Sequence, residues 1–220
     1  GYILKDYDGK PHGKLNLEQA LVKSCNTYFG EKGVIIGKDA LGEVAERFLV
    51  NKKIDFDLPV SKSSFPYKDN LGETDIAAAS IGQGKLLMTP LNMALIASGI
   101  ANKGDIVKPI LVKEVISPEG KVLRNNQPQL LTKAVDIFTA NEVKNMMVES
   151  VKRGTSRNAS IKNVRVAGKT GTAENPSGKS HAWFIGFAPA EEPKIALAVV
   201  LEEEGSTGGK AAAPIARNII

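Results

Sequence analysis

The sequence is poor in the residues that build disulfides and metal sites. Its 220 residues include one cysteine, Cys25, and two histidines, His12 and His181. A single cysteine excludes an internal disulfide, and two histidines so far apart match none of the usual zinc-ligand spacings. Cys25 has no histidine near it in the sequence, so we interpret it as a small buried residue. We expect no metal site and no cofactor.

Long apolar runs are also missing. No stretch is long enough to cross a membrane, and residues 1–15 lack the pattern of a signal peptide. Any segment that exports or anchors the protein is therefore expected upstream of Gly1. Hydrophobic residues make up 42% of the chain and charged residues 24%, which is typical of a globular protein with a buried core.

Aromatic residues are scarce, at 5% of the sequence. The net charge of +5 would suit an anionic polymer, but the basic residues are scattered among acidic ones. Nucleic-acid-binding proteins gather basic residues on one surface and often add aromatic side chains on which bases stack. We therefore expect no nucleic-acid partner.

The residues that are present predict helices first and strands afterwards. An antiparallel meander is indicated by three strand-like runs with short polar turns between them, and an alanine-rich helix follows it. This order predicts an α+β fold in which helices flank an antiparallel sheet. The expected strands are 164–174, 181–188 and 194–202, with a shorter pair at 109–116 and 120–123. The expected helices are 16–23, 26–37, 39–50, 73–80, 91–102 and one that begins at a capping box of Thr139 and Glu142.

The first strand of the meander carries Lys-Thr-Gly-Thr at 169–172. Glycine inside a strand often marks a place where a ligand or another backbone approaches closely, which is the role expected of Gly171. The Lys169 ammonium and the hydroxyls of Thr170 and Thr172 are suited to bind a carboxylate. Lys-Thr-Gly is one of three motifs of the serine acyl-transferases that act on penicillins and peptidoglycan. An ordinary surface lysine on a hairpin is the alternative.

A second motif, Ser24-Cys25-Asn26, lies at an expected helix junction, where serine and asparagine are also common as cap residues. Ser-x-Asn followed by Lys-Thr-Gly is the order found in penicillin-recognising enzymes. Two further runs strengthen the match. One is Ser80-Ile-Gly-Gln-Gly84 ahead of Thr89-Pro90, and the other is His181–Pro189, directly after the Lys-Thr-Gly strand.

Together these motifs resemble the class B penicillin-binding proteins, the peptidoglycan D,D-transpeptidases. The resemblance implies the fold shared by penicillin-binding proteins and serine β-lactamases. It identifies residues 1–220 as the C-terminal portion of a single transpeptidase domain, with a mainly helical part at 15–160 and the meander with its helix at 161–220. It also implies a place at the extracytoplasmic face of a bacterial cell membrane.

The nucleophile motif of that family, Ser-x-x-Lys, is missing. No serine in the chain has a lysine three positions later, and Ser150, with Arg153, comes nearest. We expect the nucleophile upstream of Gly1. The chain by itself is then expected to be inactive, whereas the full-length parent binds penicillin covalently.

The resemblance implies a role for each matching residue. The upstream serine would attack a D-Ala-D-Ala stem peptide or a β-lactam and form an acyl-enzyme. Ser24 would relay protons near the leaving nitrogen, and Asn26 would bind the acyl side-chain amide. Lys169 would supply positive potential. Thr170 and Thr172 would bind the substrate carboxylate, and the Thr172 N–H would form half of the oxyanion hole.

Two alternatives stay open at this point. A β-lactam sensor or a β-lactamase shares the fold and all three motifs, and a non-catalytic binding module would have lost its Ser-x-x-Lys. The strand at 194–202 adds an expectation about partners, because its run Ile195–Val200 is apolar. If upstream strands do not cover its edge, we expect self-association through it.

Overall fold

The computed structural model describes residues 3–220 and contains helices and antiparallel strands, which confirms the α+β class. The helices are α1 (Leu17–Lys23), α2 (Asn26–Ile36), α3 (Lys38–Arg47), α4 (Glu73–Ser80), α5 (Pro90–Ala101), α6 (Ile137–Arg153) and α7 (Ala212–Ile219), with 3-10 turns at Tyr7–Gly9 and Arg157–Ala159. The strands are β1 (Asp105–Val107), β2 (Glu114–Ile116), β3 (Val122–Asn125), β4 (Leu130–Lys133), β5 (Ala167–Ala173), β6 (His181–Ala188) and β7 (Ile195–Leu201).

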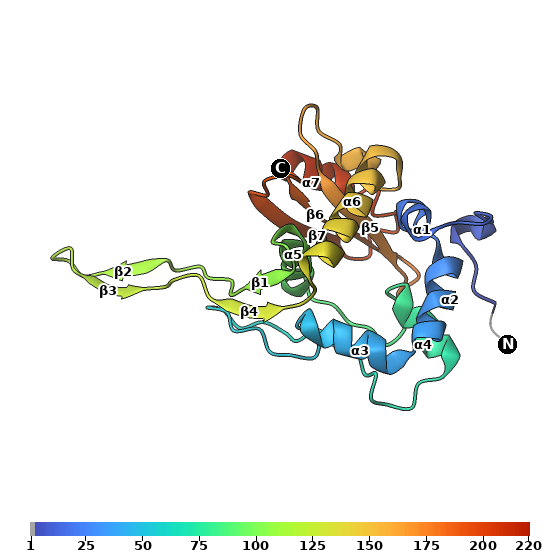
Figure 1. Ribbon diagram of the computed structural model, residues 1–220, viewed down its shortest axis with the longest axis horizontal. Coiled ribbons are helices and arrows are strands. Elements are labelled where there is room, and N and C mark those ends of the chain that lie inside the picture. Colours follow the sequence, from blue (N-terminus) through green and yellow to red (C-terminus); the bar gives the residue numbers. More distant parts are fainter. Residues whose placement is uncertain (1–2) are drawn as a thin grey trace.

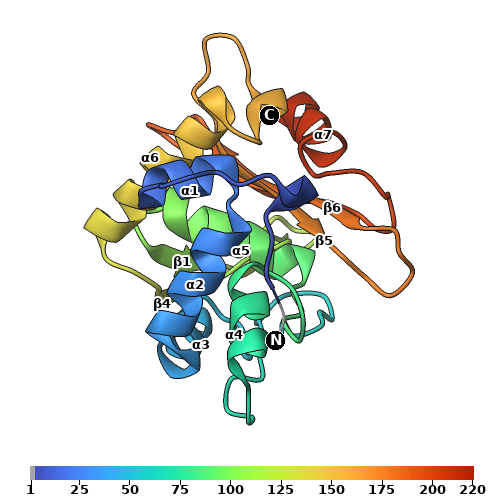
Figure 2. The ribbon, with the colours of Figure 1, turned by 90° about the vertical axis from the view of Figure 1, so that its right-hand side faces the viewer.

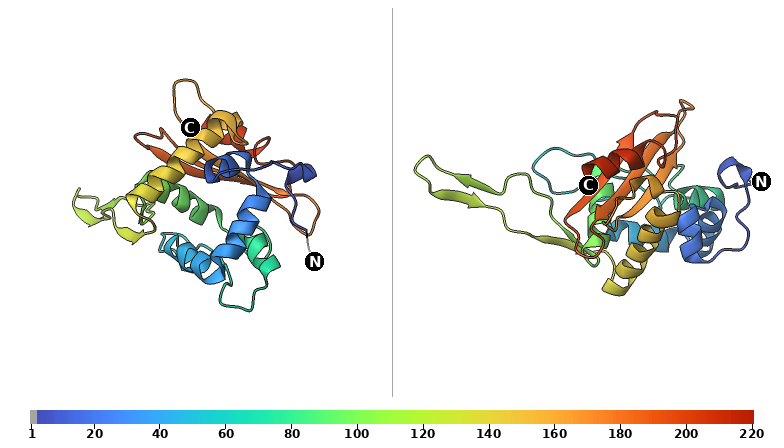
Figure 3. Two further views of the ribbon diagram at one scale, coloured as in Figure 1. Left: turned by 45° about the vertical axis from the view of Figure 1, so that its right-hand side comes forward. Right: turned by 90° about the horizontal axis from the view of Figure 1, so that it is seen from above.

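The expected meander forms the main sheet, in the order β5-β6-β7 with antiparallel pairing. Successive side chains of β6 point to opposite faces of the sheet. Phe184 is fully buried with alanines of α7, whereas Phe187 packs against α5 and α6 through Ile100 and Met147. The sheet is therefore covered on both faces by helices, as Figure 3 shows. β5 begins at Ala167, later than predicted, because Val164 forms only an isolated bridge with Ile161.

Local cap signals place three of the helix starts. The Asn16 side chain accepts the Gln19 N–H at the start of α1, and Thr89 caps α5 with Pro90 as its first residue. The capping box predicted at Thr139 is wrong. The Asp136 carboxylate accepts both the N–H and the hydroxyl of Thr139, so α6 begins at Ile137 and Thr139 lies inside its first turn.

A long two-stranded arm projects from the body (Figure 1). The base of the arm pairs β1 with β4, and its tip pairs β2 with β3. The sequence predicted only the strand pair at the tip, and the first of these strands was expected to begin at residue 109, earlier than β2 begins. Because β1 and β4 are three and four residues long and far apart in sequence, no local pattern marks them as partners.

The outer edge of β7 has no strand partner among residues 3–220. Leu197 on β7 is buried, and the other residues of that strand are half-buried. No helix in the described part of the chain is both long and apolar enough to cross a lipid bilayer.

Candidate active site

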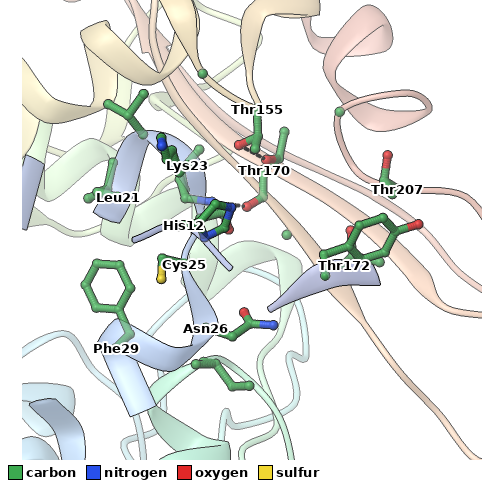
Figure 4. Close-up of a pocket in the computed structure, with 18 of the residues that line it drawn as sticks. His12, Leu21, Lys23, Cys25, Asn26, Phe29, Thr155, Thr170, Thr172 and Thr207 are labelled. Atoms are coloured by element: carbon green, nitrogen blue, oxygen red, sulfur yellow. Dashed lines mark hydrogen bonds between the residues drawn. The ribbon is translucent and has the colours of Figure 1, made fainter. Parts of the chain in front are cut away.

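A cleft of about 880 Å³ lies between β5 and the junction of α1 with α2. Its walls include the residues that the sequence analysis selected as a site: Ser24, Asn26, Lys169, Thr170, Gly171 and Thr172. Figure 4 shows Cys25 and Asn26 near the helix junction, and Thr155 and Thr170 joined by a hydrogen bond. The fold therefore brings the two motifs to one cavity.

Ser24 occupies the C-cap of α1 in a left-handed conformation, with φ 55° and ψ 51°. Its N–H bonds the carbonyls of Ala20 and Leu21, which closes the helix, and α2 starts two residues later at Asn26. A left-handed conformation costs a residue with a side chain about 1 kcal/mol or more, and such strain is often found at functional sites. The sharp turn directs the Ser24 hydroxyl toward β5.

Lys169 links the two motifs directly. Its Nζ lies 2.8 Å from Ser24 Oγ, to which it donates, and 2.8 Å from the carbonyl oxygen of Thr170. Burial of the ammonium lowers the pKa of Lys169 from 10.5 to about 8. The side chain is still mainly protonated at neutral pH. Because Lys169 also borders the cleft, its positive charge acts on any ligand bound there.

Thr170 is buried, and its hydroxyl lies 2.8 Å from that of Thr155. One hydroxyl donates to the other in such a pair, so one proton stays available for a carboxylate. The Thr170 N–H donates to Ser156 Oγ at 3.2 Å. Sequence reasoning missed Thr155 and Ser156, because they lie in a turn after α6 that carries no motif.

Thr172 is held by neighbours that are distant in sequence. Gln83 donates from Nε2 to its carbonyl oxygen at 3.1 Å, and the Gly208 N–H donates to its Oγ1 at 3.3 Å. The Thr170 N–H points outward to Ser156, away from β6. Since strand N–H groups alternate, the Thr172 N–H points outward as well. It is therefore a backbone donor at the free edge of β5.

Two glycines allow the close packing around β5. A Cβ on Gly208 would lie 2.1 Å from the Trp183 carbonyl oxygen and 2.3 Å from that of Gly171. A Cβ on Gly171 would lie 3.2 Å from the Trp183 Cβ. Gly171 thus leaves room for Trp183 and also lines the cleft, whereas Gly208 lets the loop before α7 approach the back of β5.

The helix junction has further neighbours that sequence reasoning missed. Asn26 donates from Nδ2 to the carbonyl oxygen of Lys5 at 3.3 Å, and buried Cys25 lies beside Asp6 and His12. No histidine is near Cys25 in the sequence, so the sequence indicates only a small buried residue there. The N-terminal segment, dark blue in Figure 2, runs alongside α1 and α2 and brings His12 to it.

Comparison with known proteins decides the family. The sequence pattern described as the penicillin binding protein transpeptidase domain matches residues 2–220. The chain belongs to this family. Penicillin-binding protein A from M. tuberculosis, solved as a ceftriaxone acyl-enzyme complex, superposes with a TM-score of 0.92 at 35% identity, over 98% of this chain and 51% of that one. The D,D-transpeptidase domain of a peptidoglycan glycosyltransferase from Eggerthella lenta gives 0.88 at 34% identity, over 96% and 54%.

Curated relatives agree with this assignment. The peptidoglycan D,D-transpeptidase PbpA of Mycolicibacterium smegmatis is 36% identical over 230 residues, which cover 99% of this chain and 46% of that protein. The predicted membership in the class B penicillin-binding proteins is confirmed. The chain spans about half the length of the relatives it matches.

The cleft is lined by basic side chains and by no acidic ones among the described residues. Arg153 is paired with Glu18 and Glu149, but the other cations carry no ion pair within residues 3–220. Such a wall attracts anionic ligands. The cations are Lys10, Lys23, Arg153, Arg157, Lys169 and Lys210.

A second, more apolar groove of about 860 Å³ adjoins β5. It is lined by Lys169 itself and by half-buried apolar residues of α5 and the sheet, among them Met93, Ile96 and Ile185. α5 is apolar around its whole circumference, which is the pattern of a helix buried on all sides. Here, however, part of α5 still faces the groove.

Proposed function

We propose that the chain is the C-terminal portion of a single transpeptidase domain in a peptidoglycan D,D-transpeptidase. The parent protein cross-links D-Ala-D-Ala stem peptides through a serine acyl-enzyme and binds β-lactams covalently. One observation carries the proposal: Lys169 Nζ lies 2.8 Å from Ser24 Oγ, across 145 positions of sequence, in a cleft lined by cations. The names of the relatives agree with it.

Ser24 and Lys169 serve proton transfer. The Lys169 ammonium donates to Ser24, which leaves the serine hydroxyl proton free to move to the leaving nitrogen when the acyl-enzyme forms. Lys169 also stabilises an unprotonated neighbour and attracts the substrate carboxylate. Asn26, at the start of α2, binds the amide of the acyl side chain from the opposite wall.

The β5 wall binds the substrate carboxylate and the developing oxyanion. The hydroxyls of Thr170 and Thr172 hold the carboxylate, and Thr155 joins them through its contact with Thr170. Gly171 leaves room for the substrate backbone. The outward N–H of Thr172 forms half of the oxyanion hole, and the N–H of the nucleophile forms the other half.

The nucleophilic serine and its lysine come from a segment outside this chain, which occupies the apolar groove. That groove borders Lys169 and exposes apolar side chains of α5, so an apolar helix that carries Ser-x-x-Lys would cover them and reach Ser24. The chain by itself is therefore inactive. The parent acts at the extracytoplasmic face of the bacterial membrane, held by an anchor outside these residues, without a cofactor and without a nucleic-acid partner.

Covalent labelling with a fluorescent penicillin tests the proposal. A protein that joins this chain to its upstream segment becomes labelled, and the chain alone does not. Lys169→Ala slows labelling by about 100-fold or more, as expected for a lost proton-transfer group. Lys179→Ala, which replaces an exposed lysine on the same hairpin, leaves the rate unchanged.

Three outcomes would contradict parts of this proposal. Covalent labelling of the chain alone would place a nucleophile within it. An upstream sequence without Ser-x-x-Lys would leave a non-catalytic binding module. A label that hydrolyses within minutes would indicate a β-lactamase.

The chain associates with a second copy of itself through the open edge of β7. Its backbone groups have no strand beside them within residues 3–220, so two isolated chains pair edge to edge. Sedimentation velocity over a concentration series is expected to show association. A stable monomer at high concentration would contradict it.

A further inference from the structure

The sequence run Ser80-Ile-Gly-Gln-Gly84 lies where the cleft and the apolar groove meet. Ser80 and Ile81 line both cavities, and Gln83 lines the groove. The side chain of Gln83 is half-buried, and its Nε2 donates to the carbonyl oxygen of Thr172 at 3.1 Å, across 89 positions of sequence. This contact joins the end of α4 to the edge of β5 that carries the proposed oxyanion donor.

The loop that carries Gln83 closes α4 with a hydrogen-bonded turn. The N–H of Gly82 donates to the carbonyl of Ala79 at 3.0 Å, and the N–H of Gln83 donates to that of Ala78 at 2.9 Å. Gly82, with φ 77°, supplies the left-handed conformation that this Schellman turn requires. Gly84 is left-handed as well, with φ 71°. Backbone hydrogen bonds therefore fix the point from which the Gln83 side chain reaches β5.

Thr170 and Thr172 turn their backbone groups outward, away from β6, and these four groups are not equally free. The N–H of Thr170 donates to Ser156 Oγ at 3.2 Å, and the carbonyl oxygen of Thr170 accepts from Lys169 Nζ at 2.8 Å. The carbonyl oxygen of Thr172 accepts from Gln83. Side chains thus hold three of the four groups, which leaves the Thr172 N–H as the open one within residues 3–220.

The end of β5 needs such a contact on its outer side. Ala173 is the last residue of the strand, and the edge of β5 that faces the cleft pairs with no strand among residues 3–220. Gly171 lies directly before Thr172, and glycine permits backbone rotations that other residues resist. Gln83 holds Thr172 from the side that β6 does not reach, so the backbone of Thr172 is fixed from both sides.

We propose that Gln83 is a positioning residue for the oxyanion hole. Its amide fixes the Thr172 backbone so that the free N–H points at the substrate carbonyl, a role that rests on the proposed function. Preorganised donors stabilise a transition state because they need not reorient as charge develops. The carbonyl oxygen of Thr172 has a second lone pair, so Gln83 stays in place while an extended substrate pairs with the β5 edge.

Gln83 is separate from the hydroxyls that hold the substrate carboxylate. The hydroxyl of Thr170 contacts Thr155, and that of Thr172 accepts from the Gly208 N–H, whereas Gln83 donates to the backbone of β5. Loss of the Gln83 amide should therefore slow acylation and leave the preceding non-covalent complex nearly unchanged. A misplaced donor loses part of the about 100- to 1,000-fold in rate that a whole oxyanion donor supplies, so we expect about 10-fold.

Stopped-flow labelling with a fluorescent penicillin tests this role in a protein that joins the chain to its upstream segment. Rates over a series of penicillin concentrations give the dissociation constant of the non-covalent complex and the acylation rate constant separately. Gln83→Met keeps the length of the side chain but removes its N–H groups, and we expect acylation about 10-fold slower with an unchanged dissociation constant. Gln83→Glu keeps the shape, cannot donate and adds a negative charge near the oxyanion, so it should be slower still.

Gln127→Met is the matched control, because it makes the same change at an exposed glutamine of the arm. It should react like wild type. The labelled fraction at the end of the reaction separates a positioning role from a purely structural one, since a variant that is merely less folded loses amplitude and keeps its rate.

The proposal is overturned if Gln83→Met acylates at the wild-type rate, or if its defect lies only in the labelled fraction or in the dissociation constant. Should Gln83→Met fail to fold, Gln83→Glu decides by the same measurements. A wild-type protein that is not labelled at all would count against the proposed function. Normal labelling of wild type with an unaltered rate for Gln83→Met would count against the role of Gln83 alone.

Discussion

Replacing Ser24 by alanine and by glycine separates the two things that this residue does. Both changes remove the hydroxyl that accepts from Lys169 Nζ at 2.8 Å. Only glycine also relieves the left-handed backbone, with its φ of 55°. The two variants therefore lose the same contact but differ in strain.

The expected losses of unfolding free energy follow from the hydrogen bond and from the backbone strain. A hydrogen bond to a charged group contributes about 1.5–3 kcal/mol, and the lower end applies because Lys169 keeps its bond to the Thr170 carbonyl. Ser24→Ala is thus expected to lose about 1–2 kcal/mol of unfolding free energy. Glycine adopts left-handed conformations without penalty, which returns about 1 kcal/mol. Ser24→Gly should be about 1 kcal/mol more stable than Ser24→Ala.

Urea unfolding of the chain at neutral pH, followed by the fluorescence of Trp183, the single tryptophan, measures both differences. In a protein that also contains the upstream segment, both variants should lose penicillin labelling equally, although their stabilities differ. Equal stability of the two variants would refute the left-handed conformation. Wild-type stability of Ser24→Ala would refute the contact with Lys169.

Three further predictions concern the same fold. Burial lowers the pKa of Lys169 from 10.5 to about 8, so the unfolded chain binds more protons than the folded chain between these pH values. In urea titrations the unfolding free energy of wild type should therefore rise with pH across that window, relative to that of Lys169→Met. Parallel pH dependences of the two proteins would contradict this. Asp136→Ala should lower the Tm at neutral pH, because it removes the cap of α6. Hydrogen bonds from Thr139 lower the pKa of Asp136, and protonation of the carboxylate removes the cap in wild type as well, so the difference in Tm should vanish as the pH falls. Gly208→Ala should lower the unfolding free energy measured in urea by about 1–3 kcal/mol or more, because the added Cβ would lie 2.1 Å from the Trp183 carbonyl oxygen. A variant as stable as wild type would show that the loop can move away from β5.

Local signals in the sequence were enough for much of the fold. Asn16, Thr89 and Pro90 mark helix starts through bonds made within one turn, and alternation of side chains marks the strands of the meander. The start of α6 was mistaken because Asp136 and Thr139 are both good cap residues three positions apart, and the carboxylate of Asp136 bonds the backbone N–H of Thr139. Pairing of β1 with β4 could not be predicted, since short strands carry little pattern of their own.

The sequence by itself determined which chemistry this protein carries, because Ser24-Cys25-Asn26 and Lys169–Thr172 are contiguous motifs whose residue types and order identify the family. Only the tertiary structure decided what surrounds them. Thr155 beside Thr170, Gln83 on Thr172, and Asp6 with His12 beside Cys25 are contacts between segments that chain folding brings together. Such contacts depend on how whole elements pack, and a pattern within any one segment does not record them.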